Sequence, residues 1–86
     1  MKWYSTFQHP KNWFFLIEDG GAVGYYLYVY EGIEAFERDL QKASPCSSHQ
    51  QDHLQDTLSM AQEQAFEDFG VPLDSWKKFE GANARQ

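Results

Sequence analysis

Residues 13–30 read WFFLIEDGGAVGYYLYVY, and this stretch carries the clearest structural signal in the chain. Its first part, Trp13–Ile17, is a continuous apolar run that is too short for a helix and suits a strand buried on both faces. Asp19 and Gly20 follow, and an Asp-Gly pair between two strand-like runs is a strong hairpin signal. Val23–Tyr30 is then the returning strand. The stretch predicts an antiparallel strand pair inside a sheet.

The residues before this pair add one more strand. Lys2–Gln8 alternates between two sides in the manner of a half-buried strand, and His9–Asn12 supplies turn residues. We therefore expect a three-stranded antiparallel meander over residues 2–30. A chain of 86 residues accommodates one domain, so the meander and the helices that follow it form a single α+β domain.

The returning strand presents no polar face. Because strand side chains alternate between faces, one face carries three tyrosines, Tyr26, Tyr28 and Tyr30. Two interpretations remain open: the rings pack beneath another element, or they form a binding face, since tyrosine is enriched at protein interfaces. An uncovered face would predict a homodimer or a bound partner.

Two segments connect the sheet to the C-terminal half. Ile33, Phe36 and Leu40 recur at helical spacing and predict a short helix over about residues 33–42. Residues 43–51 read ASPCSSHQQ, a polar stretch without periodicity, which predicts a flexible linker.

The clearest helical periodicity lies in residues 52–69. At about 100° per residue, one narrow stripe holds the apolar side chains Leu54, Leu58, Ala61, Ala65 and Phe69. Capping boxes that begin at Ser48 or at Asp52 leave two choices for the first turn. The end is better defined, because Gly70 suits the left-handed closing residue of a helix and Pro72 prevents continuation.

The C-terminal residues predict one more helical turn. Leu73, Trp76 and Phe79 recur at three-residue spacing, which indicates a closing turn over residues 73–79. Gly81–Gln86 has no apolar anchor and is expected to fray.

The net charge of −6 arises in one segment. Between Ala43 and Trp76 there is no Lys or Arg, while six acids occur there: Asp52, Asp56, Glu63, Glu67, Asp68 and Asp74. On the expected helix, four of them cluster opposite the apolar stripe: Asp52, Asp56, Glu63 and Glu67. Like charges four residues apart destabilise a helix, so local stability does not explain them. They form either a solvated face or a docking face for a basic protein.

One cluster has the composition of a metal site. Cys46, His49 and His53 offer a thiolate and two imidazoles, with the histidines four residues apart. The second cysteine of a zinc finger is missing, so water would have to complete the coordination. The alternative function is therefore a small metal-dependent or thiol enzyme using these residues. The competing interpretation is incidental occurrence in a polar linker, with no catalytic residue and no cofactor.

Several functions are disfavoured by composition. The acidic segment lacks the clustered Lys and Arg that phosphate neutralisation requires, which disfavours nucleic acid as a partner. The longest apolar run is far shorter than the about 20 residues of a membrane helix. One cysteine cannot form an internal disulfide, and no secretory-signal pattern is present. We expect a cytoplasmic protein without a membrane partner.

The segment DHLQDTLSMAQEQAFEDFGVPLDSW, residues 52–76, resembles the C-terminal part of small, mostly uncharacterised bacterial proteins that pair a short antiparallel sheet with one amphipathic helix. More loosely, it is similar to small acidic immunity proteins that neutralise the toxins of rival bacteria. The resemblance covers under a third of the chain and carries no catalytic motif. It implies an α+β fold and a protein partner.

Together these patterns predict a three-stranded antiparallel meander packed against one long amphipathic C-terminal helix, with the short helix at an edge or on the other face. The predicted function is non-catalytic binding of another protein, in its sharper form inhibition of a basic toxin, with self-association as a further option. The predicted protein-binding residues are Asp52, Asp56, Glu63, Glu67, Tyr26, Tyr28 and Tyr30. The acids would steer the partner and the tyrosines would supply contact area.

Overall fold

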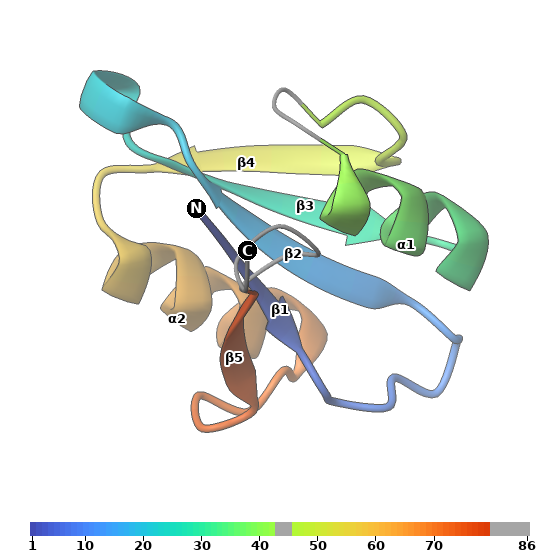
Figure 1. Ribbon diagram of the computed structural model, residues 1–86. Helices are drawn as coiled ribbons and strands as arrows, with labels where there is room; N and C mark the ends of the chain where they lie inside the picture. Colours follow the sequence, from blue (N-terminus) through green and yellow to red (C-terminus); the bar gives the residue numbers. More distant parts are fainter. Residues whose placement is uncertain (43–45, 80–86) are drawn as a thin grey trace.

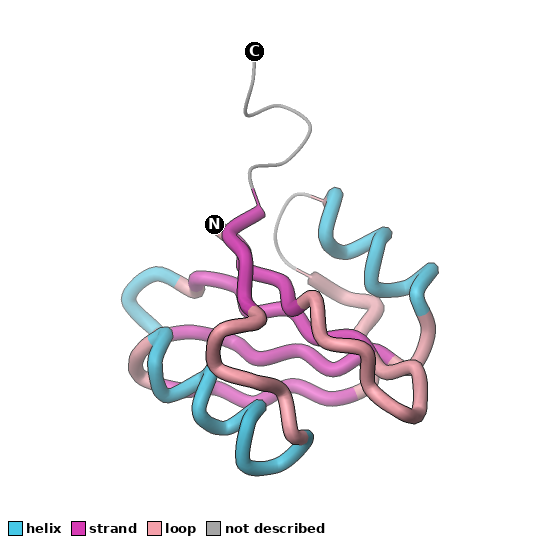
Figure 2. The backbone as a smooth tube through the Cα atoms, turned by 90° about the horizontal axis from the view of Figure 1, so that it is seen from below, coloured by secondary structure: helices cyan, strands magenta, loops and turns pink. Residues whose placement is uncertain are grey.

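The computed structural model describes residues 1–42 and 46–79, and it shows a five-stranded antiparallel sheet with a helix on each face (Figures 1 and 2). The strands are β1 (Lys2–Ser5), β2 (Phe14–Asp19), β3 (Tyr25–Tyr30), β4 (Gln51–Gln55) and β5 (Trp76–Phe79). The helices are α1 (Ile33–Gln41) and α2 (Leu58–Phe69), and a 3-10 turn, η1 (Gly21–Val23), lies between β2 and β3. Across the sheet the order is β4-β3-β2-β1-β5.

The first three strands pair as the sequence predicts. β1 lies antiparallel to β2, and β2 lies antiparallel to β3 with Phe14 opposite Tyr30. The Asp-Gly turn joins them: Asp19 Oδ1 accepts a hydrogen bond of 2.8 Å from the Gly21 N–H. The Gly20 N–H donates to the Gly24 carbonyl at 2.7 Å. The Asp19-Gly20 turn therefore determines the pairing of β2 with β3 at the centre of the sheet.

The predicted fold class is wrong in the number of strands and in the length of the second helix. Residues 51–55, expected to end the linker and begin a helix, form β4, which pairs with β3 so that His53 lies opposite Leu27. Residues 76–79, expected in a helical turn, form β5 and pair with β1. The physical reason is that β1 and β3 would otherwise leave unpaired backbone groups beside a buried core. Sheet pairing outweighs the local helical spacing.

Helix α2 begins six residues later than predicted, at Leu58 instead of Asp52. Its N-cap is Thr57, whose hydroxyl accepts a hydrogen bond of 3.1 Å from the Met60 N–H, so both predicted capping boxes are wrong. Leu54 lies on β4 and is 48% exposed. Of the predicted apolar stripe, α2 therefore contains only Leu58, Ala61, Ala65 and Phe69.

The two faces of the sheet hold separate cores. Toward α2, Phe15 and Ile17 pack with Leu27, Ala61 and Ala65. Toward α1, the core comprises Leu16, Tyr28, Tyr30, Phe36, Leu40 and Cys46. Figure 2 shows the sheet lying between the two helices. The apolar run in β2 is therefore buried on both faces, as predicted, and the predicted short helix is confirmed as α1.

Two predicted segments fall partly or wholly outside the described residues. Residues 43–45 of the expected linker do so, as does Gly81–Gln86, which was expected to fray. The remainder of the linker packs against the protein, since Cys46 is buried. Of the helices in residues 1–42 and 46–79, none is long and apolar enough to cross a membrane.

The predicted end of α2 is confirmed and generates a test. Gly70 has a φ of 76°, and its N–H and that of Val71 donate to the carbonyls of Phe66 and Ala65. A Cβ at this position would meet nothing within 4 Å, so only the backbone conformation opposes substitution. We expect Gly70→Ser to lower the free energy of unfolding by about 1 kcal/mol in urea denaturation.

The matched control is Gly32→Ser. Gly32 is the N-cap of α1 with an extended φ of −157°, and a Cβ there also meets nothing within 4 Å. Serine suits an N-cap, so this variant should lose no stability. Equal losses in the two variants would contradict the backbone explanation.

Candidate functional site

The tyrosine face of β3 is covered from within the chain. Tyr30 is fully buried and Tyr28 is 5% exposed. The Phe36 ring of α1 lies edge-on to Tyr30 with 5.7 Å between centroids, and His49 stacks on Tyr28 at 4.3 Å. Tyr26 is partly buried and stacks on Tyr28 at 5.8 Å. Of the three tyrosines predicted as contact residues, Tyr28 and Tyr30 are thus core residues, unavailable to a partner.

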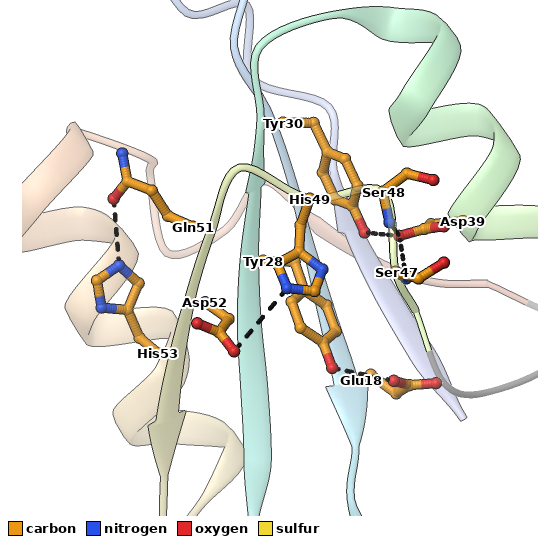
Figure 3. Close-up of polar contacts among 10 residues, drawn as sticks. All are labelled: Glu18, Tyr28, Tyr30, Asp39, Ser47, Ser48, His49, Gln51, Asp52 and His53. Carbon is orange, nitrogen blue, oxygen red and sulfur yellow. Dashed lines mark hydrogen bonds and ion pairs between the residues drawn. The ribbon is translucent and has the colours of Figure 1, made fainter.

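A buried carboxylate holds this cover in place (Figure 3). Asp39 of α1 is fully buried, and its Oδ2 accepts hydrogen bonds from the Tyr30 hydroxyl at 2.8 Å and from the Ser48 and Ser47 backbone N–H groups at 2.8 and 3.0 Å. One side chain therefore joins the sheet, α1 and the segment that leads into β4. Its Oδ1 has no hydrogen-bond partner in the part of the chain that the structure describes.

The hydrogen bonds keep Asp39 ionised. Burial by itself would raise the pKa of the carboxyl group, because a charged group loses hydration in the protein interior. The Ser48 N–H, the Tyr30 hydroxyl and the Ser47 N–H outweigh that effect and bring the pKa of Asp39 below its ordinary value of 3.8. The charge is thus part of the folded structure.

A buried lysine closes the C-terminal end of α1. Lys2 of β1 is 7% exposed, and its Nζ donates to the Asp39 carbonyl at 2.6 Å and to the Lys42 carbonyl. A cation at this position satisfies helix-end carbonyls and interacts favourably with the helix dipole. Glu18, opposite Lys2 in the β1–β2 register, accepts a hydrogen bond from the Tyr28 hydroxyl at 3.3 Å. The polar groups on this face serve the packing of α1.

Cys46 lies in the same core, and its side chain is a neutral thiol and not the thiolate that a nucleophile requires. Burial, followed by the nearby Glu18 charge, raises the pKa of its thiol to about 12. Nucleophilic cysteines react as thiolates, which a lowered pKa favours. The geometry therefore gives no support to a thiol enzyme.

The three candidate metal ligands do not converge. Cys46 and His49 lie on the α1 face, whereas the His53 ring lies on the other face, 6.2 Å from Phe69 of α2. Figure 3 shows His53 pointing away from His49, toward α2. Within residues 1–42 and 46–79, no group of three or more His, Cys, Asp or Glu could hold a metal ion.

The acidic residues lie on three elements, which divides the predicted helical stripe. Asp52 is on β4, with its Oδ2 3.9 Å from His49 Nε2, and Asp56 is in the turn before α2. Glu63 and Glu67 are exposed on α2. The division follows from the late start of the helix, which places the first two acids outside it.

The outer face of α2 combines acids with exposed apolar groups. At about 100° per residue, Glu63 points directly away from Ala61 and Ala65. Met60 and Phe66 flank it and are 43% and 52% exposed. Sequence reasoning missed these two as contact residues, although their positions off the apolar stripe could have identified them.

A scan of protein-family models and searches of curated proteins and of solved structures found no match to this chain. The resemblance of residues 52–76 to small, mostly uncharacterised bacterial proteins, and more loosely to small acidic immunity proteins, stays a prediction.

The Asp39 contacts predict an acid-sensitive fold. Because the pKa of Asp39 is lower in the folded protein, its stabilisation is complete above pH 3.8 and is lost as the pH falls through the folded value. Tyr30→Phe removes one donor, so we expect a loss of about 1–3 kcal/mol at pH 7. We also expect a shallower decline of stability as the pH falls below 3.8 in urea unfolding.

The control for this variant is Tyr26→Phe, a substitution on the same strand and face outside the Asp39 cluster. It should leave both the stability at pH 7 and the acid profile nearly unchanged. The interpretation fails if Tyr30→Phe also retains the wild-type acid profile.

Cys46 predicts a second, alkaline effect. Its pKa rises from 9.0 to about 12 on folding, so its stabilisation is present below pH 9 and is lost as the pH rises from 9 toward 12. Burial also raises the pKa of Tyr30 and Tyr28 above 10.0, so they contribute to the same decline from a higher starting pH. We expect Cys46→Ala to delay the onset of alkaline destabilisation, measured by urea unfolding from about pH 8 to pH 11. An onset identical to wild type would refute a buried neutral thiol.

Proposed function

We propose that this protein is a non-catalytic protein-binding module of the cytoplasm that docks a basic partner on the outer face of α2. The observation that supports this most directly is the exposure of Phe66, at 52%, beside Glu63 and Glu67 on one helix face. Aromatic anchors within a polar rim are the usual composition of a protein interface. In its sharper form the module inhibits a basic toxin by covering it.

The charge distribution supports a cationic partner. Helix α2 has no acid in its first turn and no base in its last turn, where Glu67 and Asp68 stand. Anions at a helix C-terminus oppose the helix dipole and reduce stability. A Lys or Arg of a partner placed at the C-terminus of α2 would offset the unfavourable interaction of Glu67 and Asp68 with the helix dipole. The two acids therefore favour binding of a cationic partner although they lower the stability of the free helix.

The other predicted contact surfaces contribute less. Tyr28 and Tyr30 are enclosed by α1 and by His49, which removes them from any interface. The alternative enzyme that would use Cys46, His49 and His53 lacks a shared site. The binding role therefore moves from the sheet face to α2, with Met60 and Phe66 taking the place of the tyrosines.

The proposal predicts opposite effects on stability and on binding. We expect Glu67→Lys and Asp68→Lys each to raise the free energy of unfolding by about 0.3–1 kcal/mol, because a cation replaces an anion at the helix C-terminus. The double variant Glu63→Lys/Glu67→Lys and the variant Phe66→Ala should each weaken the partner by about tenfold or more, since both remove contacts at the centre of the face.

Affinity capture from the native cell would identify the partner, and calorimetry at low and high salt would measure its binding to each variant. Glu37→Lys is the control, because it makes the same charge change at an exposed position on α1. A partner that binds the Glu63→Lys/Glu67→Lys and Phe66→Ala variants like wild type, or with no salt dependence, would disprove the α2 site.

A further inference from the structure

The open edge of β4 is the second feature that points to a partner. β4 pairs with β3 and forms one edge of the sheet in the described residues, with β5 at the opposite edge (Figure 1). An edge strand presents unpaired backbone N–H and C=O groups to any chain that lies beside it. Residues Asp52 and Leu54 of β4 are both exposed, Leu54 at 48%.

The hydrogen-bond alternation tells which β4 groups face outward. The Gly20 N–H donates to the Gly24 carbonyl, so alternation directs the backbone groups of Tyr25, Leu27 and Val29 toward β4. The Val29 carbonyl accepts from the Gln50 N–H, in agreement with this direction.

On β4, the residues opposite these three direct their backbone groups toward β3: Gln51, His53 and Gln55. The Gln55 carbonyl oxygen confirms the direction, because it lies 2.4 Å from where a Cβ on Gly24 would stand. The residues between them, Asp52 and Leu54, therefore turn their N–H and C=O groups away from the sheet.

The two sheet edges differ in charge. β5 carries Lys77 and Lys78, both exposed, and edge lysines prevent the pairing of a further strand. β4 has neither Lys nor Pro, one of its two outward-turned residues is Asp52, and Asp56 directly follows the strand. An acidic edge repels an acidic strand and attracts a basic one.

We propose that an extended, basic segment of a protein partner adds to β4 as a sixth strand. This inference rests on the basic partner class of the proposed function and gives that partner a second point of contact. The Asp52 and Leu54 backbone groups would pair with the segment, while Asp52 would face its Lys or Arg side chains across the strands. Helix α2 follows β4 after one turn and packs against it, so the two proposed surfaces lie on neighbouring elements.

A second copy of this chain is the less favourable occupant. Each copy carries a net charge of −6, so pairing of two β4 edges brings together chains that repel. The basic edge at β5 could meet β4 of another copy, but such a head-to-tail contact joins copies into rings or filaments and not into a closed pair. Charge complementarity therefore selects a different, basic chain.

The test uses a synthetic peptide of about ten residues that alternates Thr and Lys, a length typical of a long strand. Titrated into the isotopically labelled protein, it should shift the amide resonances of β4 and slow the hydrogen exchange of Asp52 and Leu54. A peptide that alternates Thr and Glu is the charge control, and it should bind at least about tenfold more weakly.

Comparison of Leu54→Pro with Leu54→Ala separates the contribution of the Leu54 backbone N–H to peptide binding from that of its side chain. Both lose the leucine side chain, but proline alone removes the outward N–H, and it breaks no hydrogen bond to β3. We expect the peptide to bind Leu54→Pro about tenfold more weakly than Leu54→Ala, with equal thermal stability of the two variants. If the proline variant fails to fold, the same peptide with N-methylated alternate residues tests the same hydrogen bonds on wild type.

Several outcomes overturn the inference: equal binding of the peptide to both Leu54 variants, unchanged binding of the N-methylated peptide, shifts confined to α2, or a dimer of the free protein joined through β4. The Glu63→Lys/Glu67→Lys variant reports on the proposed function separately. If that variant loses the native partner while Leu54→Pro retains it, the α2 site stands and the sixth strand fails.

Discussion

Burial of the β2–β3 pair on both faces is the constraint on which the rest of the structure depends. Phe15, Leu16 and Ile17 are consecutive and fully buried, so successive side chains enter opposite cores. A sheet with two apolar faces needs cover on each, and α1 and α2 supply it. Its lateral backbone groups need partners too, which β1 provides to β2 and β4 provides to β3, while β5 pairs with β1. The predicted three-stranded meander, with one long helix and a short additional helix, would have left the outer edges of β1 and β3 unpaired, where the structure places β5 and β4.

Covering the α1 face requires polar groups to enter a core. Helix α1 is short, and its end comes close to the sheet, so its carbonyls meet Lys2 instead of water. Asp39 receives donors from Tyr30 and from the Ser47 and Ser48 amides. Buried ionised groups are tolerated when hydrogen bonds replace their hydration. Cys46 and His49 therefore serve the packing of α1 on the sheet. A functional surface is expected on another part of the molecule.

The surfaces that remain lie on the acidic side of the molecule. Five of the six acids between Cys46 and Trp76 are carried by β4, its following turn and α2, whereas Lys77 and Lys78 lie on the opposite edge strand. This separation gives the sheet two edges of unlike charge. The outer face of α2 adds Met60 and Phe66, apolar groups that the isolated domain leaves in contact with water. Both features support the proposal of a basic protein partner.

The sequence by itself determined the elements that depend on neighbours in the chain. The Asp19-Gly20 turn, the spacing that produces α1 and the Gly70 closure of α2 are local signals, because turn chemistry and helix caps involve a few consecutive residues. Only the tertiary structure decided β4 and β5, since QDHLQ and WKKF are short and acquire strand geometry by pairing with β3 and β1. The same holds for the site. Exposure of Glu63 and Glu67 follows from helical periodicity, but the enclosure of Tyr28 and Tyr30 and the role of Asp39 arise from contacts between segments distant in sequence, which no local pattern encodes.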